Sequence, residues 1–277
     1  MSEKGYWVIR TWEAGQVGEK IKYWVQGERP GKNVRRLQSE LKKQEQNGKE
    51  AVRRLARLLN ANYKKGDLLV GLDYGDAGIE KLQERARKLM GGKREQEPEA
   101  WMDAIWAAAE AEVVNFIRRL KRACKTEEIR YIAVTSDMDG ETGLPVRIHH
   151  HIVLSAEAEE ACKRKWTMGG VDIKQLSGQP DYTPLAQYLL QQVRRIPDAK
   201  KYKPSKNLRR PKPKDRIALN GGELRLPKNA AMLYRGTTIP GRPQYIRYIL
   251  PQWAENKSTR YTQAGAHARS ETESEGT

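Results

Sequence analysis

Two strand-like segments joined by a turn-rich loop lie at the centre of the sequence, at residues 129–135 and 147–155. The intervening residues 137–145 are dense in Asp, Gly, Thr and Pro, which favour turns. The pair therefore predicts a hairpin with a long loop. Helical and strand-like segments precede and follow this hairpin, and their order indicates an α+β fold, an antiparallel sheet with flanking helices.

The segments around the hairpin suggest three regions. Apolar residues at helical spacing predict helices at 50–62 and 101–125, and Thr183 before Pro184 predicts the start of another helix. The first region, 1–59, would hold an N-terminal hairpin, a basic linker and a helix. The main domain would span 60–252, and the polar tail 253–277 is expected to be disordered.

The charge of the chain narrows the possible partners. Its 277 residues include 52 Lys and Arg against 35 Asp and Glu, a formal net charge of +17 at pH 7. Such a surplus favours the phosphate backbone of nucleic acid. The sequence has no apolar run of membrane-spanning length and no apolar signal core, so we expect a cytoplasmic protein without a membrane partner. Cys124 and Cys162 are too few for a disulfide scaffold or a four-cysteine zinc site.

Three consecutive histidines occupy the second strand of the hairpin. Successive side chains of a strand alternate between faces, so His149 and His151 share one face and His150 takes the other. Hairpin pairing would bring Asp137 across from His149, with Glu141 as the alternative carboxylate. Two imidazoles and a carboxylate suit Mg²⁺ or Mn²⁺, and Zn²⁺ less well. Histidines on an edge strand can equally have no function or bind metal adventitiously.

Tyr188 lies on the predicted helix 183–195, at the rim of an apolar face. By itself such a residue indicates packing. Near a metal ion, however, a phenol can attack a phosphate whose oxygens the ion polarises. Tyr182 and Tyr202 lie near the same helix and compete with Tyr188 for this role.

A basic segment follows the helix. Residues 200–216 contain nine Lys and Arg against one acid, Asp215. This composition predicts contacts with a phosphate backbone, although a solvated basic loop would have the same composition. The residues expected to bind nucleic acid are Lys206, Arg209, Arg210 and Lys212, together with Arg194 and Arg195 at the end of the helix.

Taken together, these motifs resemble the HUH-superfamily endonucleases with one nucleophilic tyrosine. The resemblance covers about residues 60–250 and is closest to the rolling-circle replication initiators of phages and plasmids from Gram-positive bacteria. The segment Arg147-Ile148-His149-His150-His151-Ile152-Val153-Leu154 resembles the histidine motif of the family, and Leu185-Ala186-Gln187-Tyr188-Leu189 resembles its tyrosine helix. Residues 60–74 resemble the first motif of the family. Residues 205–211 resemble the basic stretch that follows its tyrosine helix.

The resemblance implies an HUH-endonuclease (RRM/ferredoxin-like) architecture and a metal-dependent transesterification on single-stranded or hairpin origin DNA. Tyr188 would form a 5′-phosphotyrosine link, with His149, His151 and Asp137 holding Mg²⁺ or Mn²⁺. A host helicase and a DNA polymerase are implied as partners in the cytoplasm of a bacterial host, since the chain has no Gly-rich phosphate loop of a helicase.

Two positions depart from the family pattern. The family usually has Glu directly after Thr135, where this chain has Ser136 and then Asp137, and it tends to have Lys where this chain has Gln191. Alternative functions are a relaxase or a single-tyrosine transposase with the same chemistry, or a non-catalytic nucleic-acid-binding module with a decayed site.

Overall fold

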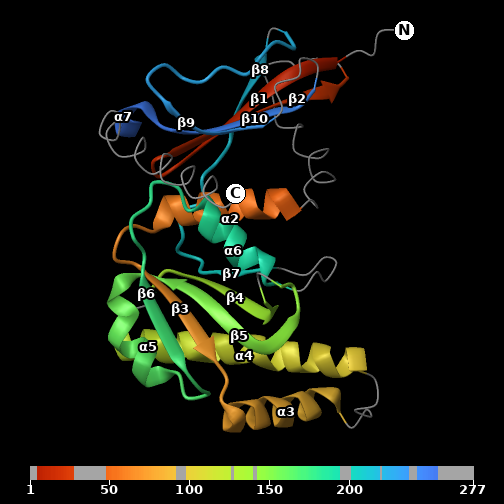
Figure 1. The fold of residues 1–277 in the computed structure, drawn as a ribbon, viewed down its shortest axis with the longest axis vertical. Helices are drawn as coiled ribbons and strands as arrows, with labels where there is room; N and C mark the ends of the chain where they lie inside the picture. The colour runs from red at the N-terminus through yellow and green to blue at the C-terminus, as the bar shows by residue number, and fades with distance from the viewer. Residues whose placement is uncertain are drawn as a thin grey trace, which may run out of the picture. The chain divides into compact units, whose positions relative to one another are not determined.

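The computed structural model describes residues 5–27, 48–91, 98–125, 128–139, 142–193, 201–218, 220–236 and 242–254. The chain forms two compact units (Figure 1). The terminal unit comprises Met1–Gln44 and Arg210–Thr277, and the central unit comprises Glu45–Arg209. This division differs from the boundaries expected at 59 and 252, because the last strands of the chain pair with the N-terminal hairpin.

The central unit is built on a five-stranded antiparallel sheet. Its strand order is β6-β3-β5-β4-β7, so the two strands of the predicted hairpin are neighbours. The hairpin strands extend beyond the predicted segments at their loop ends. The strands are β3 (Leu68–Asp73), β4 (Tyr131–Met138), β5 (Pro145–Leu154), β6 (Val171–Gln175) and β7 (Lys203–Pro204).

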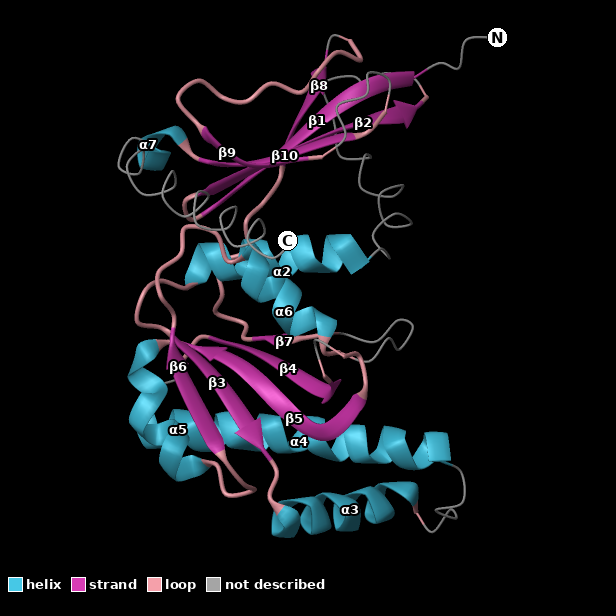
Figure 2. Cartoon of the chain, viewed as in Figure 1, coloured by secondary structure: helices cyan, strands magenta, loops and turns pink. Residues whose placement is uncertain are grey.

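Helices cover both faces of this sheet (Figure 2). One apolar cluster joins α4 and α5 to the sheet and includes Leu82 of α3, while a second joins α2 and α6 to the opposite face. Because helices pack on both faces of β5, its residues of either parity from Ile148 to Leu154 face protein, whereas its first three residues are exposed. The helices are α2 (Gly48–Asn62), α3 (Asp76–Met90), α4 (Pro98–Cys124), α5 (Glu159–Lys165) and α6 (Thr183–Gln191), with a 3₁₀ turn at Ala156–Ala158.

The terminal unit contains a second five-stranded antiparallel sheet, in the order β8-β1-β2-β10-β9. Its predicted N-terminal hairpin turns at Gly15, whose φ of 59° is readily adopted by glycine. Its elements are β1 (Gly5–Ala14), β2 (Val17–Gln26), β8 (Lys214–Ala218), β9 (Ala231–Arg235), β10 (Gln244–Ile249) and the short helix α7 (Pro251–Ala254).

The predicted α+β class with antiparallel pairing is confirmed. Throughout the described parts of the chain, every helix is too short or too polar to cross a membrane. The linker at 28–47 and most of the predicted tail, 255–277, lie outside the described residues.

Candidate active site

The three consecutive histidines of β5 alternate between the two faces of the central sheet. His150 pairs with Leu72 of β3 and Thr135 of β4, whereas His149 pairs with Asp73 and Ser136. The predicted separation of the histidines into a pair and a single residue is therefore present in the strand register.

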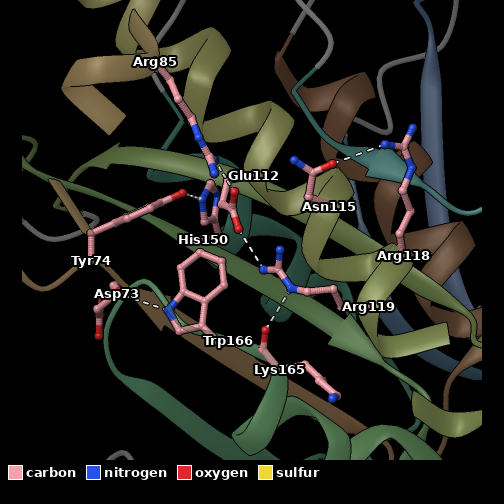
Figure 3. A network of polar contacts seen from close by, with 10 residues as sticks. All are labelled: Asp73, Tyr74, Arg85, Glu112, Asn115, Arg118, Arg119, His150, Lys165 and Trp166. Atoms are coloured by element: carbon pink, nitrogen blue, oxygen red, sulfur yellow. Dashed lines mark hydrogen bonds and ion pairs between the residues drawn. The ribbon is translucent and has the colours of Figure 1, made fainter. Parts of the chain in front are cut away.

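His150 is completely buried, on the face that packs against α4. Its Nε2 lies 2.7 Å from the Tyr74 hydroxyl (Figure 3). Its Nδ1 lies 3.1 Å from Thr135 Oγ1. Burial lowers the pKa of His150 from 6.5 to about 3. His150 is thus a neutral structural residue, with a hydrogen-bond partner at each ring nitrogen.

An ionic network around a buried carboxylate lies behind His150 (Figure 3). The carboxylate of Glu112 on α4 is 1% exposed and accepts hydrogen bonds from Arg85 and Arg119. The Arg119 guanidinium also donates to the carbonyl oxygen of Lys165 at 3.1 Å. These contacts neutralise the buried carboxylate and join α3, α4 and α5 beneath the strand that carries the histidines.

On the opposite face, His149 and His151 converge on one oxygen atom. Gln192 Oε1 lies 2.9 Å from His151 Nε2 and 3.3 Å from His149 Nε2. The two imidazole rings have centroids 5.0 Å apart and planes at 90°. Three potential metal-binding atoms, two ring nitrogens and one carboxamide oxygen, therefore point toward the same position.

The hydrogen bonding of His149 fixes which ring nitrogen is available. Its Nδ1 lies 3.0 Å from the carbonyl oxygen of Arg147, which can only accept, so Nδ1 carries the hydrogen. In the neutral ring, Nε2 then presents a lone pair to another acceptor, Gln192 Oε1. A cation between His149 Nε2 and Gln192 Oε1 would accept a lone pair from each of these atoms. Donation of the second ring N–H to a backbone carbonyl is also the usual arrangement of a metal-binding histidine.

The surroundings of His151 favour its neutral form. Burial lowers the pKa of His151, although its hydrogen bond to Gln192 and the carboxylate of Asp73 act in the opposite direction. A neutral imidazole is the form that binds a metal ion. The donor set therefore fits a divalent cation.

The end of α6 positions Gln192. Its backbone carbonyl accepts a hydrogen bond from the hydroxyl of Ser136, the residue that pairs with His149 on β4. Its side-chain Nε2 donates to the carbonyl oxygen of Tyr188 at 3.4 Å, which turns Oε1 toward the histidines. Gln192 is 5% exposed. The backbone and the side chain of this residue are thus both fixed.

Tyr188 lies beside this cluster and faces solvent. Its side chain is 46% exposed, and its ring centroid is 5.5 Å from that of His151. Since α6 places residues i and i+4 on one face, Tyr188 and Gln192 project from successive turns. The Tyr188 ring thus forms an edge contact with one of the two histidines that face Gln192.

The start of α6 is fixed by buried polar contacts to α2. Asn60 Oδ1 accepts from the Tyr182 backbone N–H at 2.7 Å, and Asp181 Oδ1 accepts from the backbone N–H and hydroxyl of Thr183 at 3.0 and 2.7 Å. The predicted cap at Thr183 is wrong, because Thr183 is already helical and Asp181 satisfies its N–H. This anchoring gives Tyr188 a defined place relative to the sheet.

The two competing tyrosines are less suited to nucleophilic attack. Tyr182 is only 5% exposed, and burial raises its pKa, which opposes formation of the phenolate. Tyr202 is half-buried and packs against the apolar cluster beneath α2 and α6. Among the three, Tyr188 alone combines exposure with a position beside His151.

The predicted carboxylate ligand, Asp137, does not pair with His149. Asp137 is buried on β4, next to an irregularity in the pairing between Ser136 and Met138. Within the described residues, no group of three or more His, Cys, Asp and Glu is arranged to hold a metal ion, so Asp137 does not complete a triad with the histidines. Glu141 lies outside the described residues.

The predicted basic segment is anchored through its backbone and exposes its side chains. Asn62, at the end of α2, accepts from the Arg209 backbone N–H at 2.7 Å and donates to the Arg209 carbonyl at 2.8 Å. Lys206, Arg209, Arg210 and Lys212 are all exposed. Arg194 and Arg195 lie outside the described residues. The four described cations are available to phosphate.

Comparisons with models of protein families, with curated proteins and with solved structures found no match for this chain. The interpretation of the site therefore depends on its own geometry.

The sequence interpretation missed Gln192 and the structural role of Ser136. The resemblance points instead to Gln191, three residues after Tyr188, but this side chain is exposed. The spacing of four residues between Tyr188 and Gln192 was the available signal, because it places an amide oxygen on the tyrosine face of the helix. No local pattern identifies Ser136, whose contact joins residues 56 positions apart.

Proposed function

We propose that this protein is a metal-dependent endonuclease and strand transferase for single-stranded DNA, with Tyr188 as its nucleophile, and that it initiates rolling-circle replication. The observation that carries the proposal is the convergence of His149 Nε2, His151 Nε2 and Gln192 Oε1 beside an exposed tyrosine. The resemblance of the histidine and tyrosine motifs supplies the biological role.

His149, His151 and Gln192 would hold the divalent ion, with Gln192 in place of the carboxylate expected from sequence. Imidazole nitrogens combined with an amide oxygen suit Mn²⁺, and Mg²⁺ accepts such a site when water or phosphate supplies further oxygens. When bound, the ion would polarise the phosphoryl oxygens of the DNA and stabilise their developing charge.

The reaction assigned to Tyr188 is a transesterification. Its phenolic oxygen attacks phosphorus, forms an O–P bond and displaces the 3′-oxygen of the neighbouring nucleotide. The phenolic proton passes to water at this exposed position, and the leaving oxygen takes up a proton to become a 3′-hydroxyl. Attack by a 3′-hydroxyl on the phosphotyrosine reverses the sequence and rejoins DNA. The free 3′-hydroxyl can prime a DNA polymerase.

The charge of the protein supports a polynucleotide substrate. The formal net charge of +17 favours phosphate binding, and Lys206, Arg209, Arg210 and Lys212 present exposed cations on the anchored segment after α6. Hairpin or single-stranded origin DNA, unwound by a host helicase, would supply the accessible strand that Tyr188 requires.

Formation of a covalent adduct tests the proposal. The full chain is incubated with Mn²⁺ and a random pool of 5′-labelled and 3′-labelled single-stranded oligonucleotides, and SDS-resistant protein–DNA adducts are mapped by mass spectrometry. We expect the 3′-labelled product on Tyr188, adducts abolished by Tyr188→Phe or EDTA, and normal adducts with Tyr182→Phe as the matched control. An adduct on Tyr182 or Tyr202, or no adduct on the wild-type chain with this pool, would overturn the proposal.

A further inference from the structure

One face of the terminal sheet carries an ordered set of aromatic and basic residues that the proposed chemistry does not use. Strand pairing places Trp7 of β1 beside Trp24 of β2. Along the same face, Arg216 of β8 and Lys22 of β2 flank Ile9, and Lys214 and Lys20 flank Thr11. An aromatic row is thus followed by two rows that each contain two cations.

The cations of this face are not neutralised within the described residues. Asp215, between the two β8 cations in sequence, points to the opposite face, where it forms an ion pair with Arg10 at 2.6 Å. The acid that shares the basic face, Glu13, lies one row further along β1, opposite Gly18. None of Lys20, Lys22, Lys214 and Arg216 forms an ion pair with a described carboxylate.

Two of these cations lie beneath a loop of the same unit, whose Leu224 and Leu226 pack in one apolar cluster with Ile9. Lys22 is 3% exposed, and its Nζ donates to the carbonyl of Gly222 at 2.5 Å. Lys20 Nζ donates to the carbonyl of Arg225 at 3.5 Å. Burial lowers the pKa of both lysines, and the charge of Arg216 lowers it further. Positive charge is therefore concentrated beside Arg216, and an anion placed there would relieve the repulsion.

The aromatic row provides a partly exposed ring next to this charge. Trp24 is 40% exposed and lies over Gly5, where an added Cβ atom would meet the indole ring at 2.4 Å. The rings of Trp24 and Trp7 form an edge contact with centroids 5.4 Å apart. Lys22 Nζ lies 5.7 Å from the centre of the Trp7 ring. These contacts fix the orientation of Trp24 while leaving part of it open.

We propose that the exposed part of this face, formed by Lys214 and Arg216 of β8 and Trp24 of β2, is a binding site for a single-stranded polynucleotide, separate from the tyrosine site of the central unit. Lys214 and Arg216, both exposed, would contact successive phosphates, and an unpaired base would stack on Trp24. Cations beside an exposed aromatic ring are the usual elements of single-strand binding, whereas a duplex offers no unpaired base to the indole.

The test measures binding of the full chain in EDTA to labelled 20-mers of single-stranded DNA, single-stranded RNA of the same sequence, and duplex DNA. Lys214→Ala/Arg216→Ala should weaken binding of at least one single strand about tenfold and flatten its salt dependence by about 1.4 slope units, about 0.7 for each lost phosphate contact. The DNA and RNA arms identify the natural strand. Lys81→Ala/Arg118→Ala removes two exposed charges from the central unit and should change binding less than twofold.

Trp24 is tested in the same assay. Trp24→Leu should weaken single-strand binding about tenfold by removing the stacking surface, and Trp24→Phe should restore most of it. Unchanged binding by both the double variant and Trp24→Leu, an equal loss in the control, or a preference for duplex DNA would overturn the proposal. EDTA prevents metal-dependent cleavage, so this outcome is independent of the fate of Tyr188.

Discussion

The two faces of β5 give neighbouring histidines different surroundings. His150 is enclosed by the α4 face of the sheet and has Tyr74 and Thr135 as partners, while His149 and His151 meet Gln192 on the face that carries α6. The backbone alternates identically at all three positions, so the difference comes from the elements packed on each face. A histidine triplet in a strand covered on both sides can therefore combine a structural residue with two potential metal ligands.

The largest expected effect concerns stability. Replacing His150 with Leu leaves the hydroxyls of Tyr74 and Thr135 buried without their partner, so His150→Leu should lower the free energy of unfolding by about 3 kcal/mol. His151→Ala, on the other face, should lower it by less than about 1 kcal/mol. Urea unfolding followed by circular dichroism measures both. Equal losses would contradict the assignment of separate roles.

A second prediction concerns the pH dependence of stability, which depends on the buried His150. The pKa of His150 is about 3 in the folded chain and 6.5 when unperturbed, so below pH 6.5 the unfolded chain binds a proton that the folded chain does not. Stability present above pH 6.5 is therefore lost as the pH falls. Between pH 7 and pH 5 the wild type should lose about 2 kcal/mol more than His150→Leu. Identical losses would show that His150 is not held neutral.

The smallest effect concerns the residue that positions Gln192. Ser136→Ala removes the hydroxyl that fixes the Gln192 carbonyl, and we expect Mn²⁺ affinity to fall about tenfold, as for other residues that orient metal ligands. Ser155→Ala, a buried serine at the other end of β5, serves as the control and should leave Mn²⁺ affinity unchanged. A larger loss in Ser155→Ala would contradict the positioning role.

Local patterns were sufficient to predict the hairpin and the shared face of His149 and His151, because strand periodicity and turn residues act over short distances. They did not reveal β8 or β9, two edge strands with mostly exposed residues and little apolar alternation. Pairing of β8 with β1 joins residues about 200 positions apart, which no local signal encodes.

The third potential ligand was missed for a similar reason. The sequence interpretation sought a carboxylate on the adjacent strand and selected Asp137, but strand pairing places Ser136 opposite His149. Gln192 lies at the end of α6, more than 40 residues from the two histidines in sequence. Its position depends on the Ser136 contact and on the fixed start of α6. Such convergence is a property of the tertiary structure.

The central claim is that Gln192 completes a divalent-metal site with His149 and His151. Its most direct test is calorimetric titration of Mn²⁺ into wild type, Gln192→Ala and Gln191→Ala, since Gln191 is an exposed neighbour with the same chemistry. We predict one site per chain in the wild type, an affinity about 100-fold weaker in Gln192→Ala, and no change in Gln191→Ala. Equal affinity in the two variants, or no binding by the wild type, would contradict the claim.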